Sequence, residues 1–234
     1  MIIWLASYPR SGSFFFRILL YHGYGIRTHS IYPMAPDSKM VGMKVRPADI
    51  MAHAPMNMSL ECMASISERH IVKTHELPAG DSYPAICLVR DGRDSLVSYA
   101  RFILSFETDD NAPKDEQAFR NTLYNLIAYN QSFGGWGPNV SRWMQRERTA
   151  IIKFEDLLQN SLEELQRTLD AVGYYPPKRM TAAAPPTFAE LHKLIPQFFR
   201  RGIIGAWRTE MPDDLHELFW QRHGSVMLEL GYQR

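Results

Sequence analysis

The chain opens with MIIWLASYPRSGSFFFRILLYHGY, residues 1–24, and this stretch predicts a strand, a loop and a helix in that order. Residues 2–6 are continuously apolar, which is typical of a central strand buried on both faces. Residues 7–13 are rich in Ser, Pro and Gly and therefore predict a loop. Residues 14–24 carry apolar side chains at helical spacing and have glycine near their end. The order is that of a phosphate-binding turn between a strand and a helix.

The predicted loop has the composition of an anion site. A loop that enters a helix presents free backbone N–H groups and the positive end of the helix dipole. The small residues Ser11, Gly12 and Ser13 let an anion approach that backbone, and Arg10 adds a charged donor. The loop is not a Walker A motif, because no glycine precedes Gly12 at the required spacing and no lysine precedes Ser13. A purely structural turn has a similar composition, so the loop alone leaves both interpretations open.

Strand and helix patterns alternate along the rest of the chain. Further strands are predicted at residues 71–74, 85–89 and 149–154. Helices are predicted at residues 94–105, 116–132, 140–146 and 156–172. This alternation predicts an α/β fold, a three-layer sandwich with a central, mainly parallel sheet. We expect residues 1–234 to form a single domain; residues 28–58 have no clear periodicity and carry no assignment.

Composition excludes several classes of function. The 26 basic and 25 acidic residues give a net charge of +1, so no overall field attracts nucleic acid. Cys62 and Cys87 have neither disulfide-framework nor zinc-site spacing, which favours reduced thiols in a cytoplasmic protein. No apolar run is long enough to span a bilayer, and the first residues lack the basic start of a signal peptide. We therefore expect a cytoplasmic protein with no metal site and no nucleic-acid partner.

Polar residues with useful chemistry follow three of the predicted strands. Ligands of parallel sheets bind at the carboxyl ends of the strands. Lys73 and His75 leave one strand, and a neutral histidine there can accept a proton from an attacking hydroxyl. Arg90 leaves the next strand and Ser98 lies two turns into the following helix; such a pair suits a phosphate. A fourth signal is the basic turn at residues 200–202. Each is weak alone, but together they predict one anion site.

In this order, the segments resemble the sulfotransferases that use 3′-phosphoadenosine-5′-phosphosulfate (PAPS), of the cytosolic and bacterial kind. The matching segments are YPRSGSFF at 8–15, KTHELP at 73–78, VRDGRDSLVSY at 89–99, FED at 154–156, RRGIIGAWR at 200–208 and LGY at 230–232. The resemblance spans residues 2–232 and is poor between about 28 and 68. The segments at 90–99 and 200–208 are the most specific.

The resemblance implies transfer of a sulfuryl group from PAPS to a hydroxyl or amine of a small-molecule acceptor, with 3′-phosphoadenosine-5′-phosphate (PAP) as product and no metal. It places the donor against Arg10, Ser11, Gly12, Ser13, Phe14, Phe15, Arg90, Ser98, Phe154, Phe188, Arg200, Arg201 and Gly202. The resemblance implies that the loop holds the phosphosulfate. Arg90 and Ser98, with Arg200, Arg201 and Gly202, would hold the 3′-phosphate, and Phe15 and Phe188 would pack on the adenine. The implied catalytic residues are His75 as general base, Lys73 near the sulfuryl group, and Arg10. The acceptor pocket is expected along 28–58 and 102–136.

Three positions depart from the family pattern. Arg10 replaces a lysine, Phe154 a tyrosine and Ala206 an acidic residue. An arginine can stabilise a leaving phosphate but cannot act as an acid. Two other interpretations remain: a P-loop-type kinase of a small molecule, which would need the missing lysine, and a non-catalytic nucleotide-binding protein, which would have no need of His75. Neither the acceptor nor the oligomeric state follows from the sequence.

Overall fold

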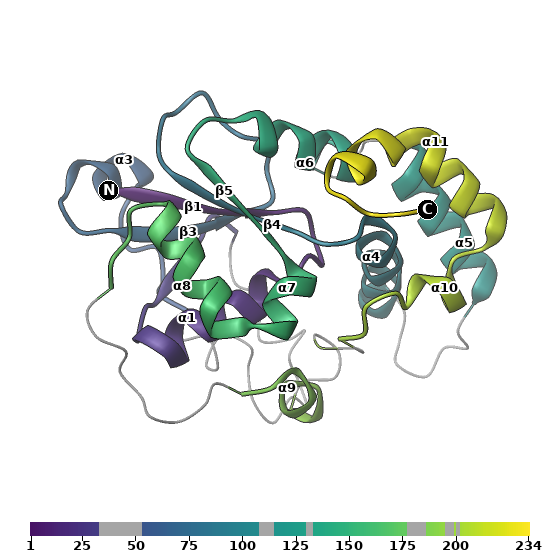
Figure 1. The fold of residues 1–234 in the computed structure, drawn as a ribbon, viewed down its shortest axis with the longest axis horizontal. Coiled ribbons are helices and arrows are strands. Elements are labelled where there is room, and N and C mark those ends of the chain that lie inside the picture. The colour runs from purple at the N-terminus through teal and green to yellow at the C-terminus, as the bar shows by residue number, and fades with distance from the viewer. Residues whose placement is uncertain (33–52, 108–114, 130–132, 177–185, 195–198, 200–201) are drawn as a thin grey trace.

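The computed structural model describes residues 1–32, 53–107, 115–129, 133–176, 186–194, 199 and 202–234, and Figure 1 shows a central sheet with helices on both faces. The strands are β1 (Ile2–Ser7), β2 (Thr28–Ser30), β3 (His70–Thr74), β4 (Ala85–Val89) and β5 (Thr149–Lys153). The helices are α1 (Ser13–Tyr24), α3 (Leu60–Ser65), α4 (Gly92–Glu107), α5 (Glu116–Ala128), α6 (Trp136–Gln145), α7 (Phe154–Gln159), α8 (Ser161–Ala171), α9 (Phe188–Leu194), α10 (Trp207–Glu210) and α11 (Asp213–Glu229).

The five described strands form one sheet in the order β2-β3-β1-β4-β5. Every pairing between them is parallel, with Leu5 of β1 opposite Lys73 of β3 on one side and Ile86 of β4 on the other. The predicted α/β sandwich is therefore confirmed, and its sheet is parallel throughout the described strands. Because the strands are parallel, the residues that follow β1, β3 and β4 meet at one edge of the sheet.

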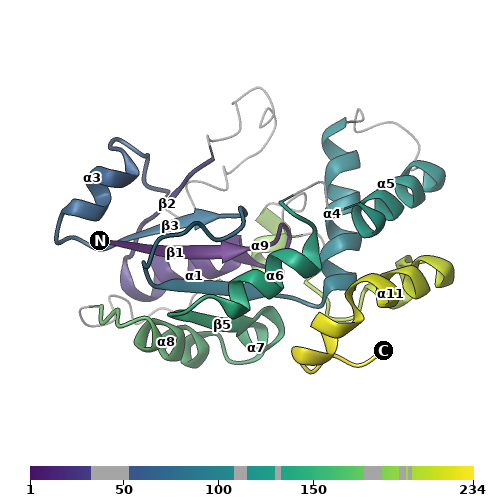
Figure 2. The same cartoon turned by 90° about the horizontal axis from the view of Figure 1, so that it is seen from above.

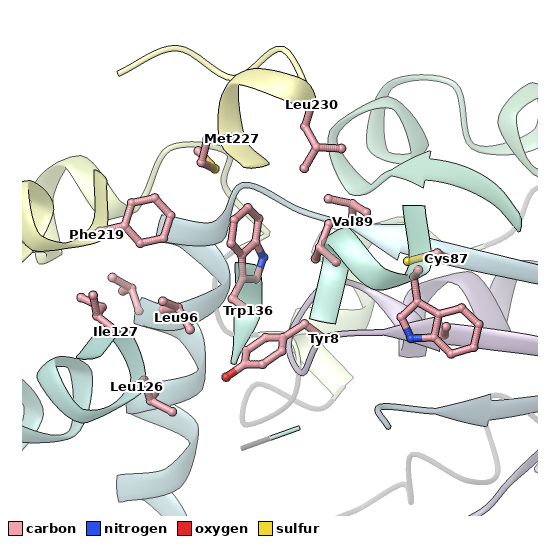
Figure 3. Close-up of a cluster of buried hydrophobic side chains, with 14 of the residues drawn as sticks. Tyr8, Cys87, Val89, Leu96, Leu126, Ile127, Trp136, Phe219, Met227 and Leu230 are labelled. Atoms are coloured by element: carbon pink, nitrogen blue, oxygen red, sulfur yellow. The ribbon is translucent and has the colours of Figure 1, made fainter. Parts of the chain in front are cut away.

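The apolar run of β1 faces a hydrophobic cluster on each side of the sheet. Ile2, Trp4 and Ala6 belong to the cluster beneath α4, α5, α6 and α11, of which Figure 3 shows a part. Ile3 and Leu5 belong to the opposite cluster, built with α1, α7, α8 and α9. Alternate residues of a strand point to opposite faces, so a strand between two helical layers must be apolar at every position.

One group of helices extends beyond the sheet. Figure 2 shows α4, α5 and α11 side by side past the carboxyl end of β1. Trp136 at the start of α6 is fully buried, and its ring lies 5.8 Å from that of Phe219 in α11. A Cβ at Gly92 would come within 2.7 Å of the Trp136 ring, so the start of α4 packs tightly against α6. This packing fixes α4, and with it Ser98, relative to the sheet.

Several predicted boundaries are wrong. The single helix predicted at 156–172 is two helices, α7 and α8, separated at Asn160, whose φ of −133° and ψ of 55° are not helical. The Ser161 hydroxyl donates to the Leu157 carbonyl at 2.8 Å across the break. The strand predicted to end at Phe154 ends one residue earlier, because Phe154 begins α7.

Other helices begin or end at different residues from those predicted. Helix α4 begins at Gly92 because the Asp91 carboxylate accepts from the Arg93 N–H at 2.9 Å. Helix α5 ends at Ala128, since Tyr129 is extended, and α6 begins at Trp136 rather than at 140. The unassigned stretch 28–58 contains β2 at its start, and residues 33–52 lie outside the described part of the chain.

The remaining expectations concern the cysteines and the membrane. Cys62 is exposed, Cys87 is buried, and both are free. In the residues that the structure describes, no helix has both the length and the apolar character required to cross a bilayer.

Candidate active site

The loop between β1 and α1 has an unusual backbone. Arg10 has a φ of 67° and Gly12 a φ of 99°, both in the left-handed region. A Cβ at Gly12 would lie 2.4 Å from Cδ2 of Phe154, so the loop backbone rests directly on that ring. Among the described residues no side chain caps the start of α1. The first N–H groups of the helix are therefore available to an anion.

We expect Gly12→Ala to destabilise the protein. A side chain at this φ costs roughly 1–3 kcal/mol, and the new methyl group would also collide with Phe154. The measurement is the midpoint of urea unfolding, with Gly80→Ala as the control because a Cβ at Gly80 meets nothing within 4 Å. Equal midpoints for the two variants would show that the loop does not depend on this close approach.

Arg10, Ser98 and Arg90 come together although they lie far apart in the sequence. Arg10 Nε donates to the Ser98 hydroxyl at 3.1 Å. Arg90 Nη1 donates to the Arg10 carbonyl at 3.3 Å. Ser98 is 7% exposed, so its hydroxyl faces the interior of this cluster. The structure thus joins the predicted phosphate residues of the loop, of the end of β4 and of α4.

Arg90 also has an unsatisfied donor. Its Nε is buried and has no hydrogen-bond partner among the described residues. Its guanidinium lies 4.8 Å from the centre of the Phe154 ring and 3.6 Å from the Asp94 carboxylate. Phe154, which replaces the family's tyrosine, is 2% exposed and supports Arg90 and Gly12 through its ring alone. A buried donor without an acceptor is costly, and an anionic ligand would satisfy it.

Asp94, in the first turn of α4, binds the backbone of Gly205 and Trp207. Its carboxylate accepts from the Gly205 N–H at 2.7 Å and from the Trp207 N–H at 2.9 Å. Burial raises the pKa of Asp94, while Arg90 and the two N–H groups act in the opposite direction. From the sequence alone, Asp94 had no role beyond its place in the segment 89–99. One signal could have singled it out: the Arg-Asp pair at 90–91 occurs again at 93–94.

Glu155 joins three of the motif segments. One carboxylate oxygen accepts from the Asp91 N–H at 3.0 Å, and the other accepts from the Tyr232 hydroxyl at 2.8 Å. Asp91 in turn pairs with Arg93 at 2.8 Å, both side chains being buried. The motifs at 89–99, 154–156 and 230–232 therefore form one network behind the site, which explains why they occur together in the sequence.

Four phenylalanines gather next to the loop. The ring of Phe188 lies 6.0 Å from Phe15, 6.3 Å from Phe154 and 5.3 Å from Phe199, measured between ring centres. Gly202 has a φ of 59°, and a Cβ there would lie 2.1 Å from the Phe188 ring. Phe15, Phe154, Phe188 and Gly202 are thus neighbours, as the resemblance implied.

The other predicted donor residues have different surroundings. The ring centre of Phe14 is 6.0 Å from the guanidinium carbon of Arg17. Ser11 is fully buried, with its hydroxyl 3.4 Å from that of Ser95. Ser13 begins α1 and is 5% exposed. Arg200 and Arg201 lie outside the described residues.

His75 is held at the same edge of the sheet by three neighbours. Its Nδ1 lies 2.6 Å from the Ser7 carbonyl oxygen, and its backbone N–H donates to the Tyr32 hydroxyl at 2.8 Å. Asn139 donates to the His75 carbonyl at 2.9 Å. Because a carbonyl only accepts, Nδ1 carries the proton and Nε2 keeps a free lone pair. This is the tautomer that a proton acceptor at Nε2 requires.

The charge around His75 is positive. Burial, followed by the charges of Lys73, Arg10 and Arg17, lowers the pKa of His75 to about 3. Lys73 is 7% exposed, and burial followed by the charge of Arg17 lowers its pKa to about 7. Its Nζ lies 4.8 Å from the centre of the Tyr32 ring. At neutral pH His75 is therefore an uncharged imidazole in an electropositive setting.

Two aromatic rings flank His75 and were not predicted individually. Tyr32 stacks on the imidazole with 5.5 Å between ring centres, and Phe133 lies 5.4 Å away. They come from the two stretches, 28–58 and 102–136, that were expected to line the acceptor pocket. No sequence signal singled them out, because Tyr32 follows a strand of only three residues and Phe133 lies in a turn.

The site can bind anions and accept a proton. Among the described residues no cluster of three or more His, Cys, Asp or Glu side chains is arranged to hold a metal ion. What the geometry does bring together is a loop of free N–H groups, the cations Arg10, Arg90 and Lys73, and a neutral histidine. Such a set suits the transfer of a charged group from a phosphorylated donor.

Comparison with known proteins assigns the chain to a family. The sulfotransferase domain family matches residues 2–231, and the chain belongs to it. The resemblance inferred from the motifs is therefore confirmed. The chain is 27% identical over 186 residues to Sulfotransferase 1E1 of Rattus norvegicus, covering 65% of this chain and 61% of that protein. It is 25% identical over 181 residues to Sulfotransferase 1B1 of Mus musculus, covering 64% and 58%. The matches thus span less than two thirds of these relatives.

Solved structures share the fold. Mouse sulfotransferase SULT7A1 complexed with PAP superposes with a TM-score of 0.65 at 17% identity, over 98% of this chain and 87% of that one. Retinol dehydratase in complex with androsterone and inactive cofactor PAP gives a TM-score of 0.58 at 17% identity, over 97% and 80%. At such identities the likeness concerns the fold alone.

Proposed function

We propose that residues 1–234 act as a single sulfotransferase domain that moves the sulfuryl group of PAPS to a hydroxyl or amine of a small-molecule acceptor. The observation that carries the proposal is the meeting of the Arg10–Ser98–Arg90 cluster and the oriented His75 at one edge of the sheet. Membership of the sulfotransferase domain family supports it, as do the two fold relatives whose names include PAP.

The donor would lie across the loop and the end of β4. In the proposal, the loop N–H groups with Arg10, Ser11 and Ser13 hold the phosphosulfate. Arg90 and Ser98 hold the 3′-phosphate, together with Gly202 and the arginines at 200–201. The orphaned Nε of Arg90 supports this, since a phosphate oxygen is the acceptor that it lacks.

The adenine would contact the phenylalanine cluster. Phe15, Phe154 and Phe188 offer ring faces and edges of the kind on which a base packs. Gly202 supports the same placement, because any side chain there would occupy the position of the Phe188 ring. Phe14 would contribute its backbone N–H at the start of α1.

The reaction would be an in-line displacement at sulfur. The acceptor oxygen or nitrogen forms a bond to sulfur, while the bond from sulfur to the bridging phosphate oxygen breaks and PAP leaves. His75 Nε2 takes the acceptor proton. Arg10 and Lys73 stabilise negative charge on the bridging oxygen and on the sulfuryl oxygens. Positioning by the loop and strand ends supplies the rest of the acceleration.

Thermal unfolding distinguishes this proposal from a P-loop-type kinase. We expect PAP at about a hundred times its dissociation constant to stabilise the protein by about 2.7 kcal/mol. For a chain of this size that raises the melting temperature by roughly 5–10 °C. ATP with magnesium should have little effect, because the loop lacks the Walker lysine. A larger shift with ATP and magnesium than with PAP would favour the kinase instead.

The rate should depend on pH in an unusual way. An ordinary histidine base with a pKa near 6.5 would lose activity about 25-fold between pH 7 and pH 5. Burial lowers the pKa of His75 to about 3, so the base stays unprotonated and kcat/KM should be nearly flat from pH 5 to 6.5. Above about pH 7 it should fall as Lys73 loses its proton. Initial rates between pH 5 and 9 test this; a half-loss near pH 6.5 as the pH is lowered would contradict it.

A further inference from the structure

A buried arginine on α1 takes no part in the proposed donor site. Arg17 is 2% exposed, and its guanidinium is held by uncharged groups only. Nε donates to the Thr28 hydroxyl at 2.6 Å, and Nη2 donates to the Thr28 carbonyl at 3.3 Å. Nη2 also lies 2.7 Å from His53 Nδ1, which must accept this bond because arginine has only donors. Nη1 donates no hydrogen bond to any described residue.

Arg17 and Lys73 form a pair of buried cations. Lys73 is 7% exposed, and the charge of Arg17 adds to burial in lowering its pKa. Strands β2 and β3 bring them to one side of the sheet, because Thr28 pairs with Ile71 and both Ile71 and Lys73 point toward α1. In the described part of the chain, no carboxylate forms an ion pair with either cation. The Glu76 carboxylate, three residues after Lys73, accepts instead from the Tyr32 hydroxyl at 3.1 Å.

Burying two positive charges without a counter-ion is costly. A buried ion normally has an oppositely charged partner, and without one its charged form is disfavoured. Burial lowers the pKa of Arg17 to about 10, although arginine usually keeps its charge under all conditions. His53, whose pKa is lowered to about 4 by burial and by Arg17, remains neutral and adds no charge. No described residue therefore places a negative charge beside Arg17, and an anionic ligand would supply one.

Both buried cations lie near enough to His75 for their charges to act on it. Lys73 precedes His75 by two residues, and the charges of both Lys73 and Arg17 act on the imidazole. Tyr32 connects the two, since its ring lies against Lys73 Nζ and stacks on His75. An anion bound by Arg17 would therefore sit within the reach of a small molecule whose hydroxyl meets His75.

We infer that Arg17, with Lys73 beside it, binds an anionic group of the acceptor, so that the acceptor is an acid carrying a carboxylate, sulfate or phosphate. This assignment rests on the proposed function and specifies its substrate class. Because no described residue accepts from Nη1, the cluster favours an anionic acceptor over the neutral phenols or alcohols that an apolar pocket would select.

Calorimetric titration of the PAP-saturated protein with benzoate and with benzamide tests the inference, since the two probes differ mainly in charge. PAP occupies the donor phosphate positions. We expect benzoate to bind at least ten-fold more tightly than benzamide, as charge-assisted hydrogen bonds to arginine exceed neutral ones by about that factor. Equal binding of the two probes, or no binding of benzoate, would overturn the inference without any variant being needed.

Variants then locate the anion. Arg17→Gln should abolish the preference for benzoate and leave the PAP dissociation constant within about three-fold, while Arg17→Lys should retain much of the preference. Arg27→Gln, at an exposed arginine before β2, is the matched control and should behave like the parent. A large loss of PAP affinity in a folded Arg17→Gln variant would assign Arg17 to the donor and overturn the inference. Failure of the parent protein to bind PAP would overturn the proposed function itself.

Discussion

His75→Ala is expected to bind PAP as tightly as the parent protein and to lose turnover by about 10²- to 10⁴-fold, the usual contribution of a general base. The reason is the tautomer fixed by the Ser7 carbonyl, 2.6 Å from Nδ1, which leaves Nε2 as the proton acceptor. Tyr32 and Asn139 bond to the backbone of residue 75, so its position does not depend on the side chain. Steady-state turnover and PAP titration are the two measurements.

Two further variants separate a catalytic from a structural role. His75→Gln keeps a side-chain donor for the Ser7 carbonyl but has no basic nitrogen, so it should fold and remain inactive. His22→Ala, at the end of α1, should turn over like the parent. Near-full turnover in His75→Ala would show that the imidazole is not the base, and loss of folding in both His75 variants would make it a core residue.

Arg90→Ala should weaken PAP binding strongly and AMP binding only slightly. Each charge-assisted hydrogen bond is worth roughly 1.5–3 kcal/mol, which corresponds to a ten-fold to 150-fold loss of affinity for one bond. Only PAP carries the 3′-phosphate that the orphaned Nε and its neighbour Ser98 would bind. Calorimetric titration with the two nucleotides measures the difference directly.

The effect of Arg90 on the protein itself needs a control. Its guanidinium also donates to the Ile203 carbonyl at 3.3 Å and lies against Phe154, so its removal will cost some stability. AMP affinity reports that general cost, and Arg222→Ala, an exposed arginine on α11, reports the cost of removing a remote charge. Equal losses for PAP and AMP would mean that Arg90 only supports the site and does not contact the 3′-phosphate.

The parallel sheet and the meeting of the candidate residues at one edge of it followed from the sequence because both depend on local patterns. A strand apolar at every position must lie between two layers, and residues 2–6 met that condition. Small residues between a strand and a helix predict an exposed backbone, and Gly12 has the left-handed φ that such a loop needs. The carboxyl ends of β1, β3 and β4 then had to lie together, since parallel strands end at the same edge of a sheet.

Other features depend on contacts that no local pattern reveals. The break at Asn160 interrupts an apolar stripe that would suit one continuous helix, so spacing alone favoured a single element. The role of Asp94 was missed because its partners, the N–H groups of Gly205 and Trp207, lie more than a hundred residues away. An arginine in a helix is ordinary in sequence, and Arg17 attracts attention only because it is buried with no acidic partner among the described residues.

The central claim is that Arg90 and Ser98 recognise the 3′-phosphate of a PAPS-type donor. Titration of the parent protein with PAP and with AMP, under identical conditions, tests this claim. We predict micromolar binding of PAP and a loss of at least ten-fold when the 3′-phosphate is absent, since one charge-assisted bond already accounts for that much. Equal affinities for PAP and AMP would contradict the account.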